Sequence, residues 1–297
     1  MPNQIVYHLG KVIKLGNMKS ELVVEAIFDP KPVYWWKNSW SFFDAKEFEH
    51  QGIKYVWGKL SKFNPEGEVI IADPASNQEK VQAEPNLQIA SSIFVYIPSL
   101  SGIAFSKVTS QIDEYQFQRL FCQIVNERHF GLLAECHIEF ISDLKTFVQK
   151  LLSLDGISGI SAKVYPPNPI FGPLWEDLKE YLRIRRSEKM MVREDSGPKE
   201  NLATKLPQVV EAIVNQPPNE PYVPDAPLPI GDAAILMAAD GYGSGQVKGR
   251  RGGEMVIIKT SETIKNFALP EDHTPEELFL TAYEEFKKVE TDRHMKH

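Results

Sequence analysis

The spacing of apolar residues changes near residue 110, and this change constrains the fold more than any other feature of the chain. Before it, apolar and polar residues alternate in segments such as 4–14, 21–28 and 52–63. A period of two is typical of strands that bury one face. After it, the segment 113–129 places its apolar residues at helical spacing. The pattern therefore predicts a β-rich N-terminal region followed by mixed helices and strands.

The segments after residue 90 predict the rest of the fold. A hairpin is expected at 93–108, where two apolar runs surround a loop of Pro, Ser and Gly. The next elements alternate between helix and strand, at 113–129, 132–141, 143–154 and 159–165. This order predicts an α+β fold with a split βαβ core. Further expected elements are helices at 173–191, 202–214 and 275–289, and a hairpin of 233–239 with 254–259.

Six prolines between residues 215 and 232 interrupt this series. Proline lacks a backbone donor, so the stretch is expected to form an extended strap. The predicted organisation has four parts: a β-rich region at 1–90, an α+β core with a long basic helix at 91–214, the strap at 215–232, and a hairpin with a helix at 233–297.

Composition limits the class of protein. The 297 residues include 40 acidic and 33 basic side chains, a net charge of −7. This excludes a uniformly basic nucleic-acid coat but not a local basic face. The two cysteines, Cys122 and Cys136, lie outside any CxxC motif, which excludes a zinc site built mainly on cysteine. No apolar run reaches the roughly 18 residues of a membrane-spanning helix. We expect a cytoplasmic protein without membrane insertion.

Positive charge is concentrated in two segments. Residues 179–193 carry six basic and two acidic side chains. Residues 246–259 carry four basic side chains and one acidic side chain. Basic side chains on a helix and at a glycine-flanked turn are a typical arrangement for phosphate contacts. The alternative is a solvated helix face and an ordinary charged hairpin. The candidate nucleic-acid-binding residues are Lys179, Arg183, Arg186, Lys189, Arg193, Lys248, Arg250 and Arg251.

An aromatic cluster lies between residues 34 and 43. Aromatic rings stack on bases, but they also fill cores and subunit interfaces. A turn at Asn38-Ser39 would expose one tryptophan. The candidate interface residues of a homo-oligomer are Trp35, Trp36 and Trp40.

Motifs that would indicate catalysis or a cofactor are weak. GYGSG at 241–245 is not followed by the Lys-Ser/Thr of a phosphate loop, and a flexible hairpin tip is the simpler interpretation. His129 and His137 flank Cys136 but lack further metal ligands, so a buried cysteine and a hydrogen-bonded histidine are expected. The chain has no GxSxG motif, and no (Asp/Glu)-x-Lys motif was found on its predicted strands. We therefore name no catalytic residues, metal or cofactor.

The order of elements resembles that of the RexA-type exclusion proteins of lambda phage and their bacterial relatives in phage defence. The similarity covers about residues 90–290, from IFVYIPSLSGIAFSKV (93–108) through ECHIEF (135–140) and FVQKLLSLDGISGI (147–160) to DAAILMAADGYGSGQVKGRR (232–251). The resemblance implies a non-enzymatic, dimeric DNA-binding sensor that triggers a separate effector. The basic residues named above rest on the charge pattern alone.

The leading hypothesis is an antiviral protein of the abortive-infection type that binds double-stranded DNA without strong sequence preference. Two alternatives belong to other classes. One is a metal-dependent nuclease of a defence system, which requires metal-dependent strand cleavage. The other is an assembly subunit that binds only protein and has no affinity for DNA even at low salt.

Overall fold

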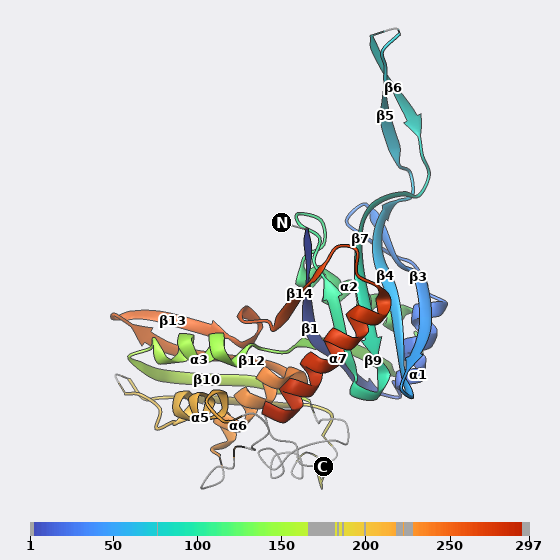
Figure 1. Ribbon diagram of the computed structural model, residues 1–297. Coiled ribbons are helices and arrows are strands. Elements are labelled where there is room, and N and C mark those ends of the chain that lie inside the picture. Colours follow the sequence, from blue (N-terminus) through green and yellow to red (C-terminus); the bar gives the residue numbers. More distant parts are fainter. Residues whose placement is uncertain are drawn as a thin grey trace. The chain divides into compact units, whose positions relative to one another are not determined.

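The computed structural model describes the chain except for residues 1–2, 76, 166–181, 183, 186, 199, 218–221, 223–227 and 293–297 (Figure 1). The chain divides into two compact units. The first comprises residues 1–7, 14–137 and 269–275, and the second comprises 8–13, 138–268 and 276–297. Strands and helices occur together, which confirms the predicted α+β class. No helix in the described part combines the length and apolar character needed to cross a membrane.

A sheet of eight strands supplies most of the first unit, although residues 8–13, 138–140 and 266–268 of its strands belong to the second unit. Its main path runs in the order β14-β1-β8-β7-β4-β3-β2, and β9 also pairs with β1. The strands are β1 (Gln4–Gly16), β2 (Val33–Trp35), β3 (Asn38–His50), β4 (Ile53–Asn64), β7 (Leu87–Ile97), β8 (Gly102–Ser106), β9 (Ala134–Phe140) and β14 (Asn266–Pro270). A 3-10 turn, Pro98–Leu100, closes the predicted β7–β8 hairpin. The unit is completed by α1 (Ser20–Phe28), α2 (Glu114–Arg128) and a separate two-stranded ribbon of β5 (Glu68–Asp73) and β6 (Gln78–Ala83).

Aromatic packing between α2 and the sheet forms the core of this unit. The rings of Phe105 and Phe117 stack with centroids 4.1 Å apart, and Phe121 lies 5.5 Å from Phe94 and 5.0 Å from Phe42. Asp113 caps α2 with a capping box of two hydrogen bonds. Its side chain accepts from the backbone NH of Gln116, and the side chain of Gln116 accepts from the backbone NH of Asp113. The helix predicted at 113–129 is confirmed, and its apolar stripe was visible in the sequence.

A four-stranded antiparallel sheet dominates the second unit. Its order is β11-β10-β12-β13, formed by β10 (Gly156–Val164), β11 (Met190–Asp195), β12 (Gly243–Arg251) and β13 (Glu254–Lys259). The helices are α3 (Leu144–Leu152), α5 (Leu206–Val214), α6 (Ile230–Met237) and α7 (Pro275–Asp292), with a π-helical turn at Ala238–Tyr242 and a 3-10 turn at Thr260–Glu262. The expected βαβ core is divided between the sheets: β8 and β9 both pair with β1, whereas β10 lies in this one.

Two segments predicted as strands are helical. Residues 21–28 belong to α1, because the buried Val23, Ala26 and Ile27 follow helical spacing. Residues 233–239 belong to α6 and the π-helical turn, where each residue from Gly231 to Tyr242 is buried. Burial on all sides removes the period that distinguishes a helix from a strand. The predicted C-terminal hairpin therefore consists of β12 and β13.

The long basic helix predicted at 173–191 is wrong at its C-terminal end. Met190 and Met191 begin β11, which also carries Arg193. Alternating exposure along this segment, with Val192 buried between Met191 and Arg193, is the signature of a strand. Most of the remaining predicted helix lies outside the described residues, as do residues 218–221 and 223–227 of the predicted proline-rich strap. The last three residues of the predicted strap, 230–232, are helical and begin α6.

The three candidate interface tryptophans have different environments. The β2–β3 turn is made by Trp36 and Lys37, both with positive φ (+49° and +63°), so it precedes the expected Asn38-Ser39 turn. Trp36 is 79% exposed, Trp35 is half-buried, and Trp40 is completely buried. The ring of Trp40 packs 6.3 Å from that of Trp35. Trp40 is thus a core residue rather than a surface contact.

Replacing the buried tryptophan should cost far more stability than replacing the exposed one. Trp40→Ala removes a fully buried ring and should lower the free energy of unfolding by about 3–5 kcal/mol. Trp36→Ala changes an exposed turn and should shift it by no more than about 0.5 kcal/mol. Urea unfolding followed by circular dichroism measures both. Equal destabilisation by the two substitutions would contradict this assignment of core and surface.

Candidate nucleic-acid interface

The predicted basic residues that the structure describes lie on or near the four-stranded sheet of the second unit. Lys248 and Arg250 are exposed on β12, and Arg193 is exposed on β11. Lys189 directly precedes β11. Lys179, Arg183 and Arg186 lie outside the described residues, so their predicted role is untested.

Strand register brings Arg193 and Lys248 to the same face of the sheet, although they are distant in the sequence. Ser161 of β10 lies opposite Arg193 on one side and Gln246 on the other. One pair further along, Gly159 lies opposite Asp195 and Lys248. Directly opposed residues in a sheet share a face. We call this surface the basic sheet face. Its members are Lys163, Ser161 and Gly159 of β10, Met191, Arg193 and Asp195 of β11, Ser244, Gln246, Lys248 and Arg250 of β12, and Met255, Ile257 and Lys259 of β13.

The opposite side of the sheet is buried and determines which side chains face outward. Val247, Ile258 and Ile160 are each at most 2% exposed. A Cβ on Gly245 would lie 2.9 Å from Cδ1 of Ile235 in α6 and 3.2 Å from Cβ of Ala238. The glycine therefore lets this helical segment approach β12 closely. With Gly245 and Val247 inward, the alternation of the strand turns Gln246, Lys248 and Arg250 outward.

Two lysines of the basic sheet face were not among the predicted site residues. Lys163 lies opposite Ser244, and Lys259 lies opposite Gln246. Lys259 had been counted in the basic segment 246–259, but Lys163 stands among apolar and small residues and gave no local signal. Only the register of β10 against β12 reveals its position. Exposed apolar side chains share the face: Met191 is 76% exposed, Met255 50% and Ile257 47%.

The charges on the basic sheet face are only partly compensated. Nε of Arg193 lies 2.7 Å from Oδ2 of Asp195, and this hydrogen bond raises the pKa of Arg193. Within the described part of the chain, Lys248, Arg250 and Lys259 form no ion pair. The face therefore carries five basic side chains and one carboxylate. A shallow cavity of about 210 Å³ lies between Arg193 and Lys248.

Arg251 points away from this face. It lies opposite Glu254 at the end of the β12–β13 hairpin, and its guanidinium donates to Oγ of Ser153, the residue that follows the last turn of α3. Gly252 and Gly253, with φ of +56° and +86°, form the turn, and the backbone NH of Gly252 donates to Asp155 at 2.8 Å. These contacts anchor the hairpin tip. Arg251, which was among the predicted nucleic-acid-binding residues, therefore lies outside the basic sheet face.

The other sequence motifs have structural explanations. GYGSG does not form a hairpin tip, because Gly241 and Tyr242 belong to the π-helical turn and Gly243 begins β12. His129 is buried, and its Nε2 lies 2.7 Å from the carbonyl oxygen of Leu22. Cys122 and Cys136 are buried with their sulfur atoms 3.9 Å apart. Among the described residues, no three His, Cys, Asp or Glu side chains lie together as a metal site would require.

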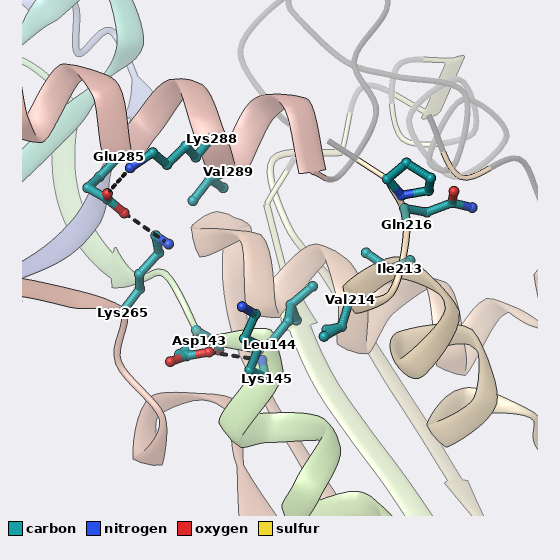
Figure 2. Close-up of a pocket in the computed structure, with 12 residues that line it drawn as sticks. Asp143, Leu144, Lys145, Ile213, Val214, Gln216, Lys265, Glu285, Lys288 and Val289 are labelled. Atoms are coloured by element: carbon teal, nitrogen blue, oxygen red, sulfur yellow. Dashed lines mark hydrogen bonds and ion pairs between the residues drawn. The ribbon is translucent and has the colours of Figure 1, made fainter. Parts of the chain in front are cut away.

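A second polar hollow lies in the same unit, with a volume of about 490 Å³. Figure 2 shows Glu285 of α7 between two lysines: its carboxylate lies 3.1 Å from Nζ of Lys265 and 2.6 Å from Nζ of Lys288. Burial by itself raises the pKa of Glu285, but hydrogen bonds from the two lysines outweigh it and lower that pKa. These contacts satisfy both lysines within the protein, which leaves the basic sheet face with the more exposed positive charge.

Glu139 of β9 adds a titratable group near the basic sheet face. Burial raises the pKa of its carboxyl from 4.5 to about 7, and the nearby ammonium of Lys163 opposes this shift. Nζ of Lys163 also lies 4.9 Å from the centre of the Tyr165 ring. As Glu139 ionises near pH 7, it adds a negative charge beside Lys163.

The raised pKa of Glu139 predicts a dependence of stability on pH. The folded protein keeps this proton up to about pH 7, whereas the unfolded chain releases it near pH 4.5. Its contribution to stability is therefore complete below pH 4.5 and is lost as the pH rises through 7. Glu139→Gln should flatten the decline of the unfolding free energy in this range, as measured by urea titrations at several pH values. Glu135→Gln, on an exposed carboxylate of the same strand, is the control, and an identical profile for both variants would contradict the assignment.

Comparison with known proteins identifies no family for this chain. No protein-family profile matches the chain, and no curated protein is significantly similar to it.

Proposed function

We propose that the protein binds double-stranded DNA through the basic sheet face, as the sensing component of an antiviral defence system. The observation that carries the proposal is the exposure on one sheet face of Lys248, Arg250 and Lys259, which have no ion-pair partner among the described residues. Five like charges on one surface repel one another, and an extended polyanion relieves that repulsion.

The composition of the face favours binding without strong sequence preference. Three of its five cations are lysines, which contact phosphates as flexible point charges. Arg193, which has the planar geometry for reading guanine, is held by Asp195. Most of the binding free energy would then come from counterion release, which does not depend on sequence.

The biological role is proposed from the resemblance to RexA-type phage-exclusion proteins. In this role the protein is cytoplasmic and self-associates, binds DNA or DNA–protein complexes formed during phage growth, and activates a separate effector. Of the candidate interface tryptophans, Trp36 has the greatest exposed area with which to contact another chain.

Salt dependence provides the sharpest test of DNA binding. Each neutralised phosphate contributes about 0.9 to the slope of log K against log salt, so Lys248→Ala/Arg250→Ala should reduce that slope by about two units and weaken binding on every duplex. The measurement is a gel-shift series at several salt concentrations, with and without Mg²⁺. The matched control is Lys31→Ala/Lys145→Ala, which removes the same charge from exposed side chains outside the basic sheet face.

Each outcome separates one class of function from the others. An equal reduction in both variants would show a net-charge effect and contradict the proposed interface. Unchanged affinity and slope in the Lys248/Arg250 variant would exclude that face as the binding site. Cleavage of the duplex only with Mg²⁺ would favour the nuclease alternative. No binding by the wild-type protein even at low salt would favour the protein-only assembly subunit.

A further inference from the structure

The ribbon formed by β5 and β6 is the least supported element of the described chain. Its two strands pair only with each other, from Glu68 opposite Ala83 to Asp73 opposite Gln78. Within the first unit, the ribbon extends beyond the ends of β4 and β7 (Figure 1). An isolated two-stranded hairpin is marginally stable in water, and three strands or a packed face are needed for independent stability.

One face of this ribbon is apolar and exposed. Ile70 lies opposite Val81, and the two are 68% and 65% exposed. Ala72 and Ala83 extend the same face, which is bordered by Glu68 and Glu79. A contiguous apolar surface with charged borders, on an element with two unpaired edges, is characteristic of a docking surface.

The charge of the ribbon complements that of the basic sheet face. Residues 66–84 contain five acidic side chains and one basic side chain, Lys80. The basic sheet face carries five basic side chains and one acidic, with Met255 and Ile257 exposed among them. An acidic surface with an apolar centre thus has a basic counterpart with apolar side chains in the same chain.

We propose that the β5–β6 ribbon of one copy docks on the basic sheet face of a second copy. Each copy offers one ribbon and one face, so a pair of copies contains the surfaces for two such contacts. The contact buries Ile70 and Val81 and neutralises the cations that lack partners. This contact gains a regulatory consequence that rests on the proposed function, because DNA and the ribbon would then compete for the same face. DNA binding would release the ribbon and so change the number of copies in the assembly.

Charge reversal tests the contact. The ribbon variant Glu66→Lys/Glu68→Lys/Glu79→Lys leaves two acidic and four basic side chains in residues 66–84, so both its ribbon and its face are basic. The face variant Lys248→Glu/Arg250→Glu/Lys259→Glu leaves two basic and four acidic side chains on the face, so both its ribbon and its face are acidic. Each variant alone should sediment as a monomer, because like charges oppose each other in both contacts. Their equimolar mixture should recover the wild-type mass in sedimentation velocity at low salt, because both contacts in the mixed dimer pair opposite charges. Circular dichroism verifies that each variant is folded.

The control Glu127→Lys/Glu135→Lys/Glu211→Lys reverses three exposed carboxylates outside the ribbon and should keep the wild-type mass. A wild-type protein that is monomeric at low salt, or a mixture that remains monomeric, would overturn the proposal. So would loss of mass with Trp36→Ala but not with the ribbon variant, since the tryptophan turn would then be the contact.

DNA binding is measured separately, so that the two proposals fail independently. The neutral variant Glu68→Gln/Glu79→Gln should bind duplex DNA more tightly than wild type, because the ribbon competes less for the face. Recovery of mass in the mixture without any DNA binding would sustain the docking contact and refute the proposed function. DNA binding through the basic sheet face with a mass insensitive to the charge reversals would sustain the function and refute the docking contact.

Discussion

The close approach of the α6 segment to β12 is the constraint on which the architecture of the second unit depends. Gly245 leaves room for Ile235 and Ala238 against the strand, and Val247 continues the buried side. Because side chains alternate along a strand, this packing decides the orientation of every neighbour on β12. A shift of one residue would move Lys248 and Arg250 into the core, where unpaired charges are strongly destabilising. The packing of apolar side chains thus creates a charged surface on the other side.

Strand register imposes the same inward and outward orientation on the strands that pair with β12 and on their neighbours. Antiparallel pairing places Lys163 and Arg193 beside the outward residues of β12 and places Lys259 beside them on β13. Solvent screens these cations, so their proximity is tolerated in the isolated chain. A bound polyanion or an acidic protein surface would convert that tolerated repulsion into attraction. DNA binding and ribbon docking are therefore alternative consequences of the same electrostatic feature.

Aromatic contacts stabilise the first unit in a different way. Phe94, Phe117 and Phe121 pack between α2 and the sheet, with Trp40 buried in the same unit. Large rings that interlock in this way bury much apolar area at fixed relative orientations. The β5–β6 ribbon has no comparable support within the described residues, which explains why its apolar side chains remain exposed.

Local chemistry in the sequence determined the elements whose signals do not depend on distant residues. The apolar stripe of 113–129 predicted α2, and alternation predicted β1 and β4. The same rules failed for residues 21–28, because this short segment fits both the strand period and the helix period. They also failed for 233–239, where burial on every side removes the period.

The concentration of charge in 246–259 identified Lys248 and Arg250 as candidates. Only the tertiary structure decided that Arg193 and Lys163 join them, that Arg251 turns away and that Trp40 is internal. The physical reason is that strand register and helix packing are set by contacts between residues far apart in the chain, and no local pattern of residues encodes which of them will meet.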